Sequence, residues 1–185
     1  MIAAGWLVWI CLPAVMFSQA PKFEDYPATV DTSFRRAPLQ LILNSERMFR
    51  TRLTEASNLP PNFAGTLRLA WWGCGSNCGS RAFVDLQTGS VQQLRPIALG
   101  ASGWERWMLR TADGGLCGWY DGAGVWGRLD SRLLLVRCGK KLIERPLSLV
   151  PDSYYLLWDG GKFRLLHQVR ADTSPPPADA QRLDQ

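Results

Sequence analysis

The chain has 185 residues, of which 46% are hydrophobic and 20% are charged, with a formal net charge of +5. This balance is ordinary for a globular domain and excludes a chain that is disordered throughout. The basic residues, mostly arginine, are scattered without a dense cluster, which predicts a solvated surface compatible with an anionic lipid or cell-wall polymer.

Residues 1–20 predict a signal peptide. They carry no charged side chain, and their apolar run, Ile2–Phe17, is shorter than the roughly 20 residues that a membrane-spanning helix needs. The run ends in Ser18-Gln19-Ala20, a small-x-small pattern that signal peptidases accept. We therefore expect a periplasmic or secreted protein, for which nucleic acid is not an expected partner.

An uncleaved N-terminal anchor is the alternative, and two features favour it. No Lys or Arg precedes the apolar run, and Pro21 would follow the cut. In that case the protein would contact the membrane only through this N-terminal segment. A lipid-modified cysteine fits less well, because Ile10 rather than a small residue precedes Cys11.

Four cysteines remain after residues 1–20, namely Cys74, Cys78, Cys117 and Cys138. An even number of cysteines in an exported chain predicts two disulfides, for which three connectivities exist. We predict nearest-neighbour pairing, Cys74–Cys78 and Cys117–Cys138, as structural braces. Zinc is the competing use of four cysteines, but no second short pair is present. No metal or cofactor is expected.

The first elements are predicted from periodicity and helix-ending residues. Residues 21–38 read as an extended lead-in whose Phe23 and Tyr26 pack on the domain. A helix is predicted over Glu46–Ser57, because Phe49, Leu53 and Ala56 form one apolar stripe. Asn44 or Ser45 could cap the start of this helix, and Pro60-Pro61 would end it.

Strands and turns follow. Leu67–Trp72 alternates with a period of two, and Leu133–Val136 is apolar on both faces, as in a central strand. Two hairpins are expected, one around Gly89 and one around Asp159-Gly160-Gly161. Strands within 103–127 are uncertain. The expected fold is mainly β (α+β), an antiparallel β meander or sandwich with one N-terminal helix packed on it. We expect this single domain to span residues 39–171. A disordered tail is expected over residues 172–185.

Two blocks, Asn62-Phe63-Ala64-Gly65 and Trp72-Gly73-Cys74-Gly75-Ser76-Asn77-Cys78, resemble those of an uncharacterised family of exported bacterial proteins. The likeness continues through Asp85–Gly89 and extends loosely over most of the chain after residue 20. It implies export and a Cys74–Cys78 bond, and it supplies no activity. In the family pattern His-Tyr follows Asn-Phe-Ala-Gly, whereas this chain has Thr66 and Leu67. Any chemistry of that histidine is therefore not expected here.

Two features could carry chemistry, and each has a structural interpretation. The only histidine, His167, shares a predicted strand face with Phe163, Leu165 and Val169, which indicates a core or rim residue. The loop Gly73–Gly79 is best explained as a structural staple. Its alternatives are a ligand loop of exposed amides and a redox pair, although redox catalysts usually carry Cys-x-x-Cys at a helix start.

Tryptophans and carboxylates supply the remaining candidates. Seven tryptophans follow residue 20, and they can serve as core or as an exposed ligand platform formed by Trp72, Trp104, Trp107, Trp119 and Trp126. A hydrolase would need two facing carboxylates. The candidates are Glu105, Asp113, Asp121, Asp130, Glu144 and Asp152, with Asp113 and Asp121 the first pair to test.

These patterns favour a monomeric, non-enzymatic binding module for a cell-envelope polymer or protein. A small envelope hydrolase that uses carboxylates near the Gly/Trp-rich segment is one alternative. A purely structural envelope protein is the other.

Overall fold

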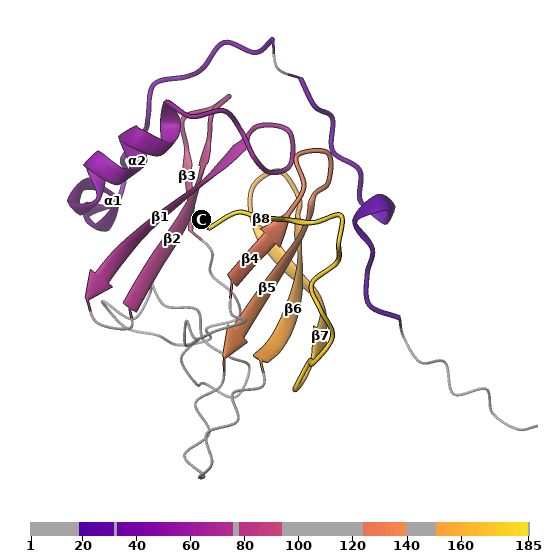
Figure 1. Cartoon of the computed structure of the whole chain (residues 1–185). Helices are drawn as coiled ribbons and strands as arrows, with labels where there is room; N and C mark the ends of the chain where they lie inside the picture. The colour runs from indigo at the N-terminus through magenta and orange to yellow at the C-terminus, as the bar shows by residue number, and fades with distance from the viewer. Residues whose placement is uncertain (1–18, 32, 76–77, 94–123, 140–150, 185) are drawn as a thin grey trace, which may run out of the picture.

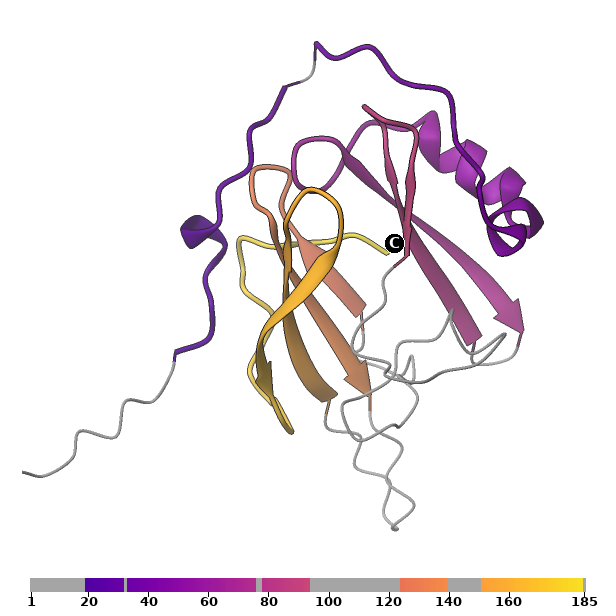
Figure 2. The same ribbon diagram turned by 180° about the vertical axis from the view of Figure 1, so that it is seen from behind.

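The computed structural model describes residues 19–31, 33–75, 78–93, 124–139 and 151–184. They form two antiparallel sheets (Figures 1 and 2). The first sheet has the order β1-β2-β3 and consists of β1 (Leu67–Gly75), β2 (Cys78–Asp85) and β3 (Val91–Gln93). The second sheet has the order β7-β6-β5-β4-β8. Its strands are β4 (Gly124–Gly127), β5 (Leu133–Gly139), β6 (Pro151–Trp158), β7 (Phe163–Val169) and β8 (Gln181–Arg182).

The main core lies between the two sheets. Leu67, Leu69 and Phe83 of the first sheet belong to one buried cluster with Leu134 and Leu156 of the second sheet. Alternate residues of β5 face opposite ways, so Leu133 and Leu135 join a different cluster on the outer face of the second sheet. The predicted mainly β fold is confirmed, and Leu133–Val136 lies in the central strand with both faces covered, as its unbroken apolar run indicates.

Two short helices cover the outer face of the first sheet: α1 (Asn44–Met48) and α2 (Arg50–Ser57). Leu53 and Ala56 are buried against Ala70 and Trp72 of β1, as the predicted stripe requires. The prediction of one continuous helix is wrong, because Phe49 (φ −106°, ψ 22°) leaves helical geometry between α1 and α2. Neither Asn44 nor Ser45 is the N-cap residue, because α1 begins at Asn44 and its N-cap is Leu43. The Glu46 carboxylate accepts the N–H groups of Ile42 and Leu43.

The lead-in runs from the outer face of the second sheet to that of the first (Figures 1 and 2). A short 3₁₀ turn, η1 (Phe23–Asp25), places Phe23 in the outer cluster of the second sheet, and Tyr26 packs on the same cluster. Phe34 of the lead-in packs on the helix side of the first sheet, as do Leu39 and Leu41, which follow the lead-in. The lead-in therefore covers apolar surface on both sheets.

Two glycines let the lead-in approach the sandwich closely. Gly65 (φ +79°) and Gly89 (φ +76°) adopt left-handed conformations, and a Cβ built on them would lie 2.1 Å from the Thr29 carbonyl oxygen and 1.9 Å from the Pro38 carbonyl oxygen. Real Cβ atoms do not approach carbonyl oxygens this closely. The glycine of the Asn62-Phe63-Ala64-Gly65 block thus has a structural role, since it seats residue 29 of the lead-in.

We expect Gly65→Ala to lower the free energy of unfolding by about 1–3 kcal/mol, because alanine is strained at positive φ and its Cβ displaces Thr29. Urea denaturation measures the loss. Gly161→Ala is the matched control, since Gly161 lies in a turn with open space around its Cβ position and no positive φ. An equal loss in both variants would contradict the seating role of Gly65.

The C-terminal tail is ordered through residue 184, so the prediction of a disordered tail is wrong for residues 172–184. Gln181 and Arg182 pair with β4, Leu183 is 4% exposed in the core between the sheets, and Asp172 and Asp184 are also buried. The tail has almost no apolar content, but its aspartates meet buried arginines far away in sequence. Those partners cannot be identified from the tail itself.

Candidate functional site

The tryptophans that were candidates for a ligand platform do not form one in the described part of the chain. Trp72 is 3% exposed, and its ring lies 4.7 Å from that of Phe49 under the helices. Trp126 is 6% exposed and packs in the outer cluster of the second sheet. Both are therefore core residues on different sheets. Trp104, Trp107 and Trp119 lie outside the described residues.

The four cysteines are placed only in part. Cys138 is buried in β5. Cys74 lies near the end of β1 and Cys78 at the start of β2, the neighbouring antiparallel strand. Cys117 and the side chains of Cys74 and Cys78 lie outside the described residues, so both pairings stay predictions.

His167 shares a sheet face with Val169, as its spacing predicted, but not with Phe163 and Leu165. A β-bulge shifts the register of β6 and β7, so Tyr155 pairs with His167 while Leu156 pairs with Leu165. His167 therefore faces the outer cluster with Tyr155, at a ring distance of 6.0 Å, instead of sharing a face with Leu165. It is partly exposed, as expected for a rim residue.

His167 and Leu166 line a cavity of about 440 Å³ whose other walls are residues 19–22 and the lead-in residues Asp25 and Tyr26. The predicted cleavage position after Ala20 lies on this wall. Gln19 and Ala20 are exposed, whereas Phe23 is buried three residues later. The chain is therefore accessible at the predicted cleavage position and becomes buried three residues later, at Phe23.

Among the described residues, no cluster of three or more His, Cys, Asp or Glu side chains is arranged to hold a metal ion. Of the six candidate carboxylates, Asp130 and Asp152 are described. Asp130 pairs with Arg128, and Asp152 accepts the Ala171 N–H at 2.9 Å. The other four, Glu105, Asp113, Asp121 and Glu144, lie outside the described residues.

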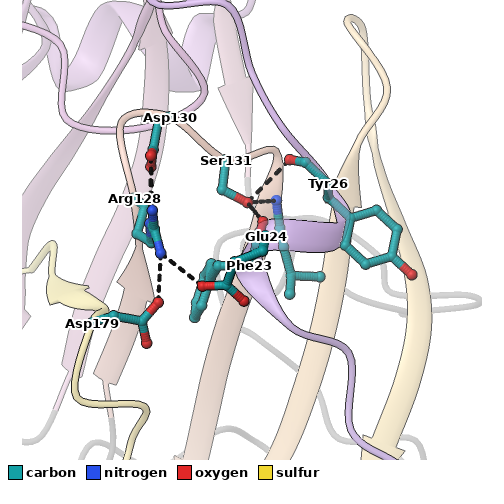
Figure 3. Close-up of polar contacts among 8 residues, drawn as sticks. Phe23, Glu24, Tyr26, Arg128, Asp130, Ser131 and Asp179 are labelled. Carbon is teal, nitrogen blue, oxygen red and sulfur yellow. Dashed lines mark hydrogen bonds and ion pairs between the residues drawn. The ribbon is translucent and has the colours of Figure 1, made fainter.

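Arg128 joins three segments of the chain at one point (Figure 3). Its guanidinium contacts Glu24 of the lead-in at 2.9 Å, Asp130 of the β4–β5 turn at 2.8 Å and Asp179 of the tail at 2.6 Å. The hydrogen bonds from Arg128 hold the pKa values of Asp130 and Asp179 below their usual range. The three carboxylates are about half exposed, and exposed ion pairs contribute little to stability. The main effect of this junction is therefore to orient the lead-in and the C-terminal tail relative to the β4–β5 turn.

Ser131 fixes the lead-in beside this junction (Figure 3). Its hydroxyl is within hydrogen-bonding distance of the carbonyl oxygens of Phe23, at 2.8 Å, and Tyr26, at 3.1 Å, and it accepts the Leu133 N–H. Pro27 and Ser131 also form an isolated antiparallel β-bridge. The β4–β5 turn is thus the docking point of the lead-in, which the sequence did not indicate.

Two further arginines are buried in ion pairs with the tail. Arg137 of β5 binds Asp172 at 2.9 Å, and the Ser153 hydroxyl donates to the same carboxylate at 2.6 Å. Arg81 of β2 binds Asp184 with both Nε and Nη2. The four side chains are at most 7% exposed. Burial, partly offset by the charge of Asp184, lowers the pKa of Arg81 to about 10.

The strongest candidate for a binding surface lies around α1, at the outer edge of the molecule (Figures 1 and 2). We call it the α1 corner and define it as Ile42, Leu43, Arg47, Met48 and Arg50. Met48 (77%) and Ile42 (71%) are the two most exposed large apolar side chains among the described residues. Arg47 and Arg50 are also exposed. The sequence pattern does not indicate this surface, because the break at Phe49 separates α1 from the apolar stripe that α2 buries.

No helix of the described residues is long and apolar enough to span a bilayer. Comparisons of the chain with protein-family models, with curated proteins and with solved structures find no match.

Proposed function

We propose that the protein is an exported, non-enzymatic binding module of the cell envelope and that the α1 corner is its binding surface. One observation carries the proposal. Three of the large apolar side chains exposed in the described residues, Ile42, Leu43 and Met48, fall within seven positions, beside two exposed arginines. Exposed apolar side chains that gather on one surface mark interaction sites, whereas isolated ones are ordinary.

Export is supported by the sequence of residues 1–20, by the exposure of Gln19 and Ala20 and by the resemblance to exported bacterial proteins. In an oxidising compartment the pairs Cys74–Cys78 and Cys117–Cys138 would act as structural braces. An envelope polymer or an envelope protein would then be available as a partner. A purely structural envelope role is the second candidate, favoured by the burial of Trp72 and Trp126 in the two outer clusters.

Co-sedimentation with isolated cell envelopes tests the proposal. The protein is purified after export without a C-terminal tag, because Leu183 and Asp184 are buried. We expect an intact mass that lacks residues 1–20, and binding to envelopes that falls on the order of tenfold or more in Ile42→Ser/Met48→Ser. The matched control is Leu165→Ser, an exposed apolar residue on β7 (38%). Equal envelope binding by the wild type and both variants would refute the α1 corner as the binding surface.

A further inference from the structure

We propose that the partner of the α1 corner is the surface of an anionic lipid bilayer, in which Ile42 and Met48 insert while arginines bind the headgroup phosphates. The inference rests on the proposed function and makes it specific, since export places the domain beside a membrane.

The exposed apolar side chains are held outward by their neighbours. Leu41 and Phe49, which bracket them, pack on the buried cluster between the helices and the first sheet. The Glu46 carboxylate accepts the N–H groups of Ile42, at 2.7 Å, and Leu43, at 2.9 Å. The backbone of the corner is therefore fixed at both ends and in the middle. Ile42 and Met48 thus project from a backbone that is anchored by packing and hydrogen bonds, which lowers the entropic cost of binding.

The charge at the corner is complementary to an anionic surface. Over residues 33–59 there are five arginines and two glutamates, a net charge of +3. Glu46 is 4% exposed and bonded to backbone, and Glu55 is paired with Arg52 at 3.0 Å. The corner itself presents two exposed cations, Arg47 and Arg50. Arg47 also makes two long hydrogen bonds, to the Leu41 carbonyl and to the Asn44 side chain, both at 3.4 Å. Arginine binds phosphate oxygens through two parallel N–H groups.

The chemistry of the apolar side chains favours a bilayer over the other envelope partners. Ile42, Leu43 and Met48 are aliphatic or thioether side chains, suited to hydrocarbon, whereas carbohydrate sites generally offer aromatic faces. Exposed apolar side chains beside basic ones are typical of segments that lie in the membrane interface. The basic side chains attract anionic lipid headgroups, and the apolar side chains insert below the headgroups.

Vesicle co-sedimentation of the exported protein tests the inference. One set of vesicles contains phosphatidylglycerol and phosphatidylcholine, and the other contains phosphatidylcholine alone. We expect binding to the anionic vesicles that weakens as salt is raised, and little binding to the neutral vesicles. Arg47→Gln/Arg50→Gln should weaken binding roughly 25-fold, about fivefold for each arginine. Ile42→Ser/Met48→Ser should weaken it on the order of tenfold or more, and Leu165→Ser should leave it unchanged.

Each other outcome overturns the inference. Equal binding to neutral and anionic vesicles would show that arginine contacts to headgroup phosphates do not contribute. Binding at the wild-type level by both corner variants would show that the α1 corner is not the membrane-binding surface. The far-ultraviolet circular dichroism of each variant is compared with wild type, so that a loss of binding is not a loss of fold. If the corner variants lose envelope binding while the wild type ignores vesicles, the bilayer is the wrong partner and the proposed function stands.

Discussion

Asp184→Ala is expected to lower the free energy of unfolding by about 3–5 kcal/mol, because it leaves the Arg81 guanidinium buried without its carboxylate. The side chain of Asp184 is fully buried and that of Arg81 is 5% exposed. Burial already lowers the pKa of Arg81 to about 10, and the charge of Asp184 works against this shift. Equilibrium denaturation in urea at neutral pH measures the loss.

Asp179→Ala is the matched control, since Asp179 also lies in the tail and also pairs with an arginine, but its side chain is 45% exposed. An exposed pair contributes at most about 1 kcal/mol. The double variant Arg81→Met/Asp184→Leu should recover most of the loss, because apolar side chains of similar size replace a buried pair at little cost. Equal losses at Asp184 and Asp179 would show that the tail does not pack between the sheets.

Local patterns predicted the strands of this fold well, because turn chemistry and periodicity act over a few residues. Gly89 and Gly160 both have positive φ and both lie in the turns that their sequences indicated. The apolar run of β5 is covered on both faces. In each of these elements the signal and the structure that it specifies occupy the same stretch of chain.

The features that sequence analysis missed depend on contacts between distant residues. Asp184 meets Arg81 over 103 positions, and Arg128 meets Glu24 over 104. The bulge between His167 and Leu165 reverses a face that strict alternation assigns. One extra residue in a strand leaves no mark in composition, so the side of the sheet on which His167 lies was not predictable.

The candidate site shows the same limit. Tryptophan content alone could not distinguish a ligand platform from core, and the structure places Trp72 and Trp126 in the core. The α1 corner instead arises from the interruption at Phe49, which ends one helix and begins the next. The apolar stripe of α2 packs on the first sheet. Ile42 and Met48 lie outside that stripe and stay exposed.

Acid should unfold the protein partly through Asp172. Burial opposes ionisation of this carboxyl, but hydrogen bonds from Ser153 and Ser174, together with Arg137, hold its pKa below the usual value. A carboxylate with a lowered folded-state pKa stabilises the fold above its unfolded-state pKa of about 3.9, and this contribution is lost as pH falls through the folded-state pKa. Asp172→Asn should therefore cost about 3 kcal/mol at neutral pH, since Arg137 stays buried.

The pH profile distinguishes this linkage from a simple packing defect. Urea denaturation of the wild type and of Asp172→Asn is measured between neutral pH and the acid transition. The two stabilities should converge as pH falls, because a protonated Asp172 in the wild type resembles the uncharged asparagine of the variant. Asp25→Asn, which alters an exposed carboxylate, should track the wild type throughout. A constant gap between wild type and Asp172→Asn at every pH would mean that the charge of Asp172 does not hold the tail on β5.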